Sequence, residues 1–236
     1  MLKLDAITVQ FGGLTALKGV SLAIGAEEVV GLVGPNGAGK TTLFNVISGL
    51  ARPSGGEVFF NRDNVLKAPM YKRARMGIGR TFQIPQPMHE LTVRQNLLVA
   101  QRFGTGKVNL EKIEEILTFL HLEGKADRDA AQDLSLSELK ALEVGKALAT
   151  DPQLLLLDEV LAGLETASKR AFMKTLTELH QKYRISILII EHDIETISSL
   201  CRRVCVLNYG QLIADGTPQE VFSNPEVIKS YTGGGA

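Results

Sequence analysis

Residues 34–42 combine the residue types and the spacing that bind phosphate. They directly follow the apolar run 29–33, and an amphipathic stretch follows them. The pattern is G-x-x-x-x-G-K-[ST] between a predicted strand and a predicted helix, where glycines let successive backbone N–H groups point at an anion and the helix dipole adds positive charge. We therefore predict a nucleoside triphosphate site rather than a glycine-rich turn with a solvated lysine. Its residues are Gly34, Pro35, Asn36, Gly37, Ala38, Gly39, Lys40, Thr41 and Thr42.

Two carboxylates, Asp158 and Glu159, follow the apolar run 154–157. With Lys40 as a cation for the outer phosphates and the Thr41 hydroxyl as a ligand for Mg²⁺, they complete what hydrolysis needs. Asp158 can hold the metal through water, and Glu159 can polarise the attacking water. Two acids at the end of a strand are also common as solvated turn residues, and the phosphate loop is what favours the catalytic interpretation.

His192 follows a second apolar run, residues 185–190. The functional interpretation is a hydrogen-bonding group for the γ-phosphate and for a neighbouring subunit. The alternative is an exposed loop histidine, with Asp193 alone acting as a helix N-cap. Taken by itself, His192 favours the alternative.

A sheet must position these residues, and the sequence predicts one. The runs 154–157 and 185–190 indicate strands of a parallel sheet covered on both faces. The helix between them has Phe172, Leu176, Leu179 and Tyr183 at helical spacing, a stripe that indicates core packing. Further strands are predicted within residues 1–30, at 55–60 and at 78–82, the first two in an antiparallel layer.

Helices dominate residues 86–150. A capping box at Thr92 opens the first helix, a second follows Asn109, and a third starts near Ser137. The chain then ends with a hairpin around Tyr209 and Gly210 and with a capping box at 217–220.

Composition excludes several classes of protein. Lysine plus arginine equals aspartate plus glutamate, 26 each, so no global field indicates nucleic acid. No stretch approaches the roughly 18 apolar residues that span a bilayer, and the N-terminus lacks a signal peptide core. We expect a cytoplasmic chain, soluble or peripheral. Cys201 and Cys205 are expected to be small buried hydrophobes, and the tail 233–236 is expected to fray.

The order of these motifs resembles that of an ABC transporter ATP-binding subunit over essentially the whole chain. The resemblance implies an α/β fold, namely a P-loop NTPase core with a mostly parallel sheet, an N-terminal antiparallel β layer and an inserted α-helical subdomain. It implies one ABC ATPase domain over 1–236, with its core at 1–85 and 151–236 and the helical subdomain at 86–150.

The resemblance also assigns roles by position. Phe11 would stack on the adenine of ATP. Gln83 would sense Mg²⁺ and water and link to a membrane subunit, so that Thr41, Gln83 and Asp158 form the metal set. Glu159 would be the general base and His192 the switch histidine. Ser135 would donate its hydroxyl to ATP bound by a second subunit.

The resemblance further implies a head-to-tail dimer with a second ATP-binding subunit, homo- or heterodimeric. This dimer would drive membrane-spanning permease subunits from the cytoplasmic side of the inner membrane. An extracytoplasmic solute-binding protein is then an indirect partner, and nucleic acid is not one. Several segments resemble importers of branched-chain and other hydrophobic amino acids, specifically the larger of their two ATPase subunits; importers of urea and amides share much of the pattern. These segments are 11–14, 16–17, 79–83, 162–164, 216–218 and 220–221.

The segment 134–138, called the signature segment below, departs from the family pattern Leu-Ser-Gly-Gly-Gln. It has Leu136, Ser137 and Glu138 at the last three positions, and Ser137 adds a Cβ where glycine allows close approach to phosphate. Residues 135–138 also form a capping box, which is needed simply to start a helix. Nearby, Glu165 and Val160 replace the usual Asp or Asn and the usual proline.

Three functions follow for comparison. The first is the ATP-hydrolysing motor of an importer. The second is a weakly hydrolysing nucleotide switch in an asymmetric heterodimer, which the altered signature segment favours and Lys40, Glu159 and His192 disfavour. The third is a soluble ABC ATPase of translation or DNA repair, which would usually carry a second cassette or a coiled-coil insertion that this chain lacks.

Overall fold

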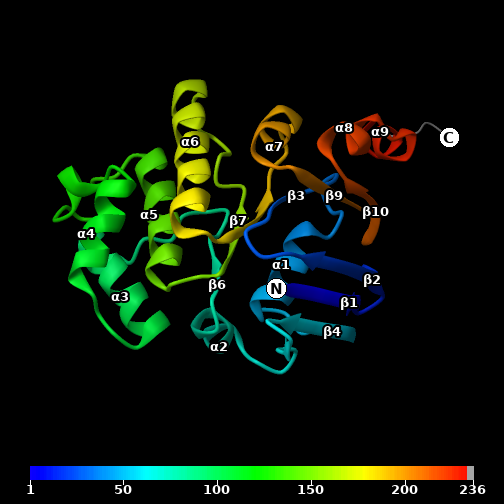
Figure 1. Ribbon diagram of the computed structural model, residues 1–236, viewed down its shortest axis with the longest axis horizontal. Helices are drawn as coiled ribbons and strands as arrows, with labels where there is room; N and C mark the ends of the chain where they lie inside the picture. Colours follow the sequence, from blue (N-terminus) through cyan, green and yellow to red (C-terminus); the bar gives the residue numbers. More distant parts are fainter. Residues whose placement is uncertain (233–236) are drawn as a thin grey trace. The chain divides into compact units, whose positions relative to one another are not determined.

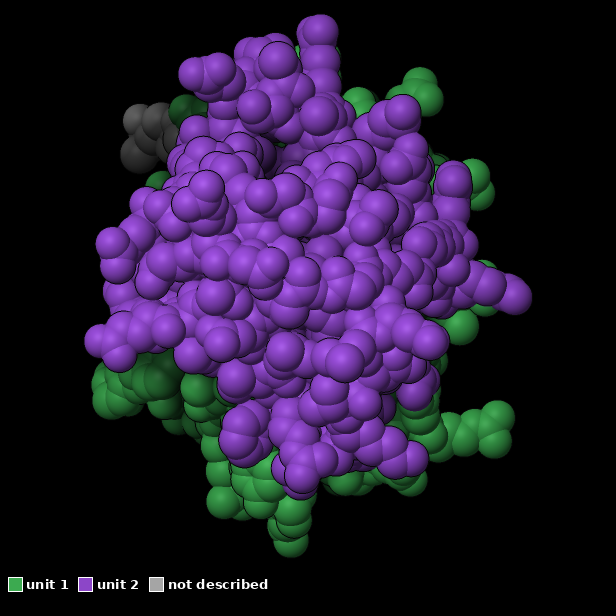
Figure 2. Space-filling view, turned by 90° about the vertical axis from the view of Figure 1, so that its left-hand side faces the viewer, with its two compact units in different colours: residues 1–73, 186–236 green, residues 74–185 purple. Residues whose placement is uncertain are grey.

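The computed structural model describes residues 1–232, so the tail predicted to fray lies outside the described residues. The chain divides into two compact units (Figure 2). Unit 1 contains residues 1–73 and the C-terminal part from Ser186 onward, and unit 2 contains residues 74–185. Within the described part of the chain, no helix combines the length and the apolar character that a membrane crossing requires.

Unit 1 begins with the predicted antiparallel layer. Strands β1 (Leu2–Phe11), β2 (Leu14–Ile24), β4 (Gly55–Phe60) and β5 (Asp63–Asn64) form a sheet in the order β2-β1-β4-β5, and the first three lie side by side in Figure 1. Leu2 and Leu4 are buried before the first register shift with β2, and Ile7 and Val9, which are separated by a second shift, are buried as well. Alternating burial along β1 is what a sheet with one covered face requires.

The second sheet of unit 1 carries the phosphate loop. Strand β3 (Val29–Val33) pairs in parallel with β8 (Ser186–Ile190) on one side and with β9 (Arg203–Asn208) on the other, while β10 (Gln211–Gly216) is antiparallel to β9. Every residue of β8 is buried, as expected for a parallel strand covered on both faces. The hairpin predicted around Tyr209 and Gly210 is the β9–β10 turn.

Among its residues that the structure describes, unit 1 contains four helices. They are α1 (Lys40–Ser48), α7 (Ile194–Leu200), α8 (Pro218–Ser223) and α9 (Pro225–Thr232); α8 begins with the predicted capping box, and α9 was not predicted. Another unpredicted helix, α2 (Met70–Arg75), runs across the boundary between the two units.

Arg73, in α2, holds the far end of α1. Its guanidinium donates to the carbonyls of Val46 and Ile47 at 2.7 and 2.9 Å, and to those of Leu66 and Ala68 at 3.2 and 2.9 Å. The residue is 1% exposed, and burial lowers the pKa of Arg73 to about 10. Arg73 therefore satisfies carbonyls at a helix C-terminus that lack partners within the helix.

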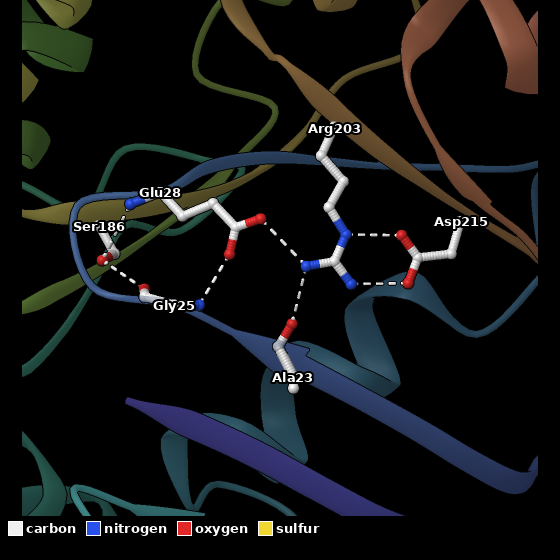
Figure 3. A network of polar contacts seen from close by, with 6 residues as sticks. All are labelled: Ala23, Gly25, Glu28, Ser186, Arg203 and Asp215. Atoms are coloured by element: carbon white, nitrogen blue, oxygen red, sulfur yellow. Dashed lines mark hydrogen bonds and ion pairs between the residues drawn. The ribbon is translucent and has the colours of Figure 1, made fainter.

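A polar network joins the strand ends near the start of β3 (Figure 3). Arg203 makes two hydrogen bonds of 2.6 Å to Asp215 and one of 3.0 Å to Glu28. Glu28 accepts from the Gly25 N–H at 2.7 Å, and the Ser186 hydroxyl donates to the Gly25 carbonyl at 2.9 Å. The hydrogen bonds from Arg203 outweigh desolvation and lower the pKa of Asp215.

Both cysteines are buried in unit 1, as predicted. Cys201 is 4% exposed and Cys205 is fully buried, and both are reduced. Burial raises the pKa of the Cys201 thiol to about 12 and raises that of Cys205 as well. Both are therefore neutral, apolar side chains near neutral pH.

Unit 2 contains the predicted helices and two parallel strands. Helices α3 (Val93–Thr105) and α4 (Leu110–Phe119) pack against α5 (Leu136–Ala149), and a short 3₁₀ helix, η1 (Glu123–Lys125), follows α4. Strand β6 (Ile78–Arg80) pairs with β7 (Leu154–Asp158), after which α6 (Thr166–Tyr183) begins. The predicted strand at 78–82 is thus too long at its end, because the Thr81 N–H makes the last backbone bond to β7, at 2.9 Å.

Helix packing in unit 2 follows the predicted apolar stripes. Phe172, Leu176 and Leu179 of α6 are buried. Tyr183, the last member of that stripe, is half-buried; its ring meets Phe119 edge-on with centroids 5.8 Å apart. The stripe is therefore core packing, as predicted.

Candidate functional site

The phosphate loop of unit 1 adopts the backbone that the sequence predicts. Gly34, Gly37 and Gly39 have φ angles of 147°, 79° and 105°, a region that side chains other than glycine rarely enter. Packing imposes a second requirement at two of them. A Cβ on Gly34 would lie 2.0 Å from the Leu207 carbonyl oxygen, and one on Gly39 would lie 2.8 Å from the Ala16 carbonyl oxygen.

The turn between β9 and β10 is hydrogen-bonded to this loop. The Gly210 N–H donates to the Ala38 carbonyl at 3.0 Å, and the Gly210 carbonyl accepts from the Lys18 N–H at 2.8 Å. Tyr231 of α9 also reaches the loop. Burial raises the pKa of Tyr231, and the Gly34 N–H, which donates toward its hydroxyl, opposes that rise. Residues far apart in sequence thus fix the loop in a receptive shape.

Lys40 lies folded onto its own loop. Its ammonium donates to the Gly34 carbonyl at 2.7 Å and to the Pro35 carbonyl at 3.0 Å. Lys40 is buried, whereas Thr41 is exposed and Thr42 half-buried in the first turn of α1. That turn contains no acid, so positive charge from the helix dipole and Lys40 is available to an anion.

Two other predicted residues of unit 1 are exposed. Phe11 ends β1 with 56% of its surface accessible, which leaves its ring available for stacking. His192 lies between β8 and α7 and is exposed. The capping role weighed for Asp193 is confirmed, because its carboxylate accepts from the Glu195 N–H at 3.1 Å and from the Thr196 hydroxyl at 2.7 Å.

In unit 2 the structure brings together two of the predicted catalytic residues. The Gln83 side chain donates to the Glu159 carboxylate at 2.7 Å. Glu159 has a φ of 50°, in the left-handed region, and its carbonyl accepts from the Lys140 ammonium at 2.8 Å. Strained residues of this kind persist only where their surroundings hold them. Gln83 and Lys140 hold the side chain and the backbone of Glu159, respectively.

Asp158, the last residue of β7, is 3% exposed. Its carboxylate pairs with Arg80 at 3.3 Å, and its backbone N–H donates to the Thr81 hydroxyl at 3.1 Å. Sequence reasoning assigned no role to Arg80 or Lys140. Both residues lie outside the phosphate-loop, carboxylate and histidine motifs, and no pattern in the sequence marks Lys140 as a partner of Glu159.

Ser135 is the N-cap residue of α5. The predicted capping box is present: its hydroxyl donates to Glu138 at 2.6 Å and accepts from the Glu138 N–H at 3.4 Å. Lys125 donates to the same carboxylate at 2.8 Å. Desolvation raises the pKa of Glu138, but hydrogen bonds from Lys125 and Ser135 outweigh it and lower that pKa. Glu138 therefore carries negative charge within the signature segment.

Comparison with known proteins agrees with this arrangement. The family model described as ABC transporter matches residues 17–162, and a second, described as Branched-chain amino acid ATP-binding cassette transporter, matches residues 211–236. The high-affinity branched-chain amino acid transport ATP-binding protein LivG of Salmonella typhimurium is 36% identical over 250 residues, covering 99% of this chain and 98% of that protein. BraF of Pseudomonas aeruginosa, which has the same description, is 34% identical over 249 residues with the same coverage.

Solved structures show the same fold. A nucleotide-free ATP-binding cassette from an ABC transporter superposes with a TM-score of 0.88 at 33% identity, covering 98% of both chains. The ADP conformation of an ATP-binding cassette of an ABC transporter also gives 0.88, at 34% identity and with 99% of this chain covered. The chain therefore belongs to the ABC transporter ATP-binding family, and it is an ATPase of that family.

Proposed function

We propose that this chain is the ATP-hydrolysing motor subunit of an importer for branched-chain or other hydrophobic amino acids. Relatives with branched-chain descriptions match nearly its whole length, and the branched-chain model matches its C-terminal segment 211–236. The catalytic assignment in this proposal rests on the hydrogen bond of 2.7 Å from Gln83 to the Glu159 carboxylate and on the Glu159 backbone, which lies in the left-handed region.

The residues have separate tasks in this proposal. The phosphate loop and Lys40 bind the phosphates of ATP, and Phe11 stacks on its base. Glu159 takes a proton from the attacking water, while Gln83 fixes which carboxylate oxygen faces that water. His192 would contact the γ-phosphate.

The donor set suits Mg²⁺. Among residues 1–232 no cluster of three or more His, Cys, Asp or Glu side chains could hold a metal without help from a ligand. Mg²⁺ usually takes one or two protein oxygens and completes its shell with water and phosphate, which fits Thr41 and Asp158, with Gln83 as a sensor. When bound, Mg²⁺ supplies charge neutralisation at the β- and γ-phosphates.

The proposed partners follow from family membership. Two ATP-binding subunits would clamp ATP head to tail, with Ser135 of one facing ATP on the other, and both would act on membrane-spanning permease subunits. The chain would then be peripheral on the cytoplasmic side of the inner membrane, supplied indirectly by a solute-binding protein. We also keep the predicted division into a core and a helical subdomain at 86–150 as part of this proposal.

Glu159→Gln tests the catalytic assignment. This variant should bind ATP as the parent does and lose hydrolysis, because the amide cannot accept the proton. Glu123→Gln is the matched control, since Glu123 of η1 is an exposed glutamate of the same unit. Parent-like turnover by Glu159→Gln in a phosphate-release assay would rule out Glu159 as the base.

One observation favours a second candidate function, the weakly hydrolysing half of a heterodimer. The Ser135 hydroxyl is committed to Glu138, whose negative charge would oppose a phosphate brought to that helix N-terminus. The solution mass of Glu159→Gln with and without MgATP separates the candidates. An ATP-dependent shift from monomer to dimer supports a working clamp, and a monomer that still binds ATP supports a need for a different partner chain.

Amino acid specificity is tested in the assembled importer. Stimulation of ATP hydrolysis by binding protein loaded with leucine, isoleucine or valine supports the proposal. Stimulation only by urea or amides would replace it.

A further inference from the structure

The pairing of β6 with β7 brings an arginine to the carboxylate assigned to the metal. Arg80, the last residue of β6, is in register with Leu156, and Asp158 lies two residues beyond Leu156 on β7. Residues two apart on a strand point to the same face of the sheet. The strand register itself therefore places the Arg80 side chain beside Asp158.

The resulting ion pair is almost completely buried. The Arg80 and Asp158 side chains are 3% and 4% exposed, and a guanidinium nitrogen (Nη2) lies 3.3 Å from a carboxylate oxygen (Oδ2). An ionised carboxylate is expensive to bury without a counter-charge, so Arg80 stabilises an Asp158 that carries its full charge.

Arg80 has a second support. Its guanidinium carbon lies 5.0 Å from the centroid of the Phe82 ring, within the range of cation–π attraction. The Asp158 backbone, in turn, is fixed independently by the Thr81 hydroxyl at 3.1 Å. Neither charged group depends only on the other for its position, so the ion pair can be weakened without releasing either residue.

We propose that Arg80 is a resident counter-ion of Asp158 that competes with Mg²⁺ and thereby lowers the affinity of the ATP site for the metal. The proposal rests on the proposed role of Asp158 in metal binding. A divalent cation that shares the Asp158 carboxylate meets the positive charge of Arg80 at close range in a site with little water, where charge repulsion is strong. Arg80 is a positioning residue in this scheme, because it acts through Asp158.

The test measures metal dependence of binding rather than turnover. The Kd of β,γ-imido-ATP is determined by calorimetry in EDTA and in Mg²⁺. The Kd in EDTA divided by the Kd in Mg²⁺ reports how much the metal contributes to binding. Arg80→Met and Arg80→Gln both remove the charge, and the Gln variant keeps a hydrogen-bond donor in case the Met variant does not fold. Arg80→Lys keeps a charge, and Arg128→Met removes an exposed arginine from the same unit as a control.

The ratio should rise at least about tenfold in Arg80→Met and Arg80→Gln, because the competing charge is gone. The Kd in EDTA should stay within about twofold, and Arg128→Met should resemble the parent. Arg80→Lys keeps the charge but loses the planar guanidinium that lies against Phe82, so its ratio should fall between those of the parent and of Arg80→Met. An unchanged or smaller ratio in both charge-removing variants would overturn the proposal and leave the pair with a structural role only.

Asp158→Asn separates this outcome from failure of the proposed function. If Asp158→Asn abolishes the effect of Mg²⁺ while the Arg80 variants leave it unchanged, only the counter-ion proposal fails. If Asp158→Asn keeps the parent ratio, the metal role of Asp158 is wrong, and the counter-ion proposal falls with it.

Discussion

Removing the Arg73 guanidinium should destabilise the chain by about 3 kcal/mol. Arg73→Met keeps the apolar stem and deletes four hydrogen bonds to carbonyls. Hydrogen bonds that involve a charged group contribute about 1.5 kcal/mol each at the low end of their range. Against this, burial lowers the pKa of Arg73 to about 10, which indicates a desolvation penalty of about 3 kcal/mol that the variant escapes.

Differential scanning calorimetry of the nucleotide-free protein measures this effect. For a chain of this size, about 3 kcal/mol corresponds to a fall in Tm of roughly 6–12 °C. Lys72→Met, at the exposed neighbouring position of α2, should change stability by no more than about 0.5 kcal/mol. If both variants melt within about 2 °C of the parent, the reasoning that Arg73 holds the C-terminus of α1 is refuted.

Three further predictions concern the loop, the network and the base. Gly34→Ala should lower Tm far more than Gly12→Ala. Both glycines have positive φ, but only a Cβ on Gly34 would collide with a backbone oxygen, at 2.0 Å. Equal shifts in Tm, measured by calorimetry, would contradict this prediction. The pKa of Asp215 is lowered in the folded state, so its ion pair stabilises fully above the unfolded value of 3.8 and is lost as pH falls through the folded pKa. Asp215→Asn should therefore flatten the dependence of Tm on pH below about 5, and an unchanged slope would count against the network. Lys140→Met should reduce ATP turnover about tenfold or more with ATP affinity unchanged, because it removes the hydrogen bond to the Glu159 carbonyl. A parent-like kcat would show that catalysis does not depend on this hydrogen bond.

Local motifs made the phosphate loop predictable. The motif spans nine consecutive residues, and each of its conformational requirements, such as positive φ at Gly37, depends on residues nearby in sequence. Capping boxes at Thr92, Ser135 and Thr217 were predictable for the same reason, because a box joins residues three apart.

Residues that act through distant partners were not predictable. Arg73 lies in the run Tyr-Lys-Arg-Ala-Arg, which has the composition of a solvated surface, yet it is 1% exposed. Its acceptors Val46 and Ile47 are carbonyls, and every residue type offers a carbonyl. Arg80 and Lys140 meet their partners through strand register and helix packing, and a single sequence specifies neither directly.

The position of β3 in its sheet has a consequence for the order of events during synthesis. Both neighbours of β3 come from the last part of the chain, β8 from Ser186 and β9 from Arg203, and the hairpin turn at Gly210 completes the support of the loop. At roughly 5–20 residues per second, a ribosome needs roughly ten to thirty seconds between releasing β3 and releasing the first of these neighbours. Until then the apolar β3 has no partner within its sheet. The nucleotide site, although encoded near the start of the chain, is therefore among the last parts to form, and a nascent chain that ends before β8 cannot hold ATP in this way.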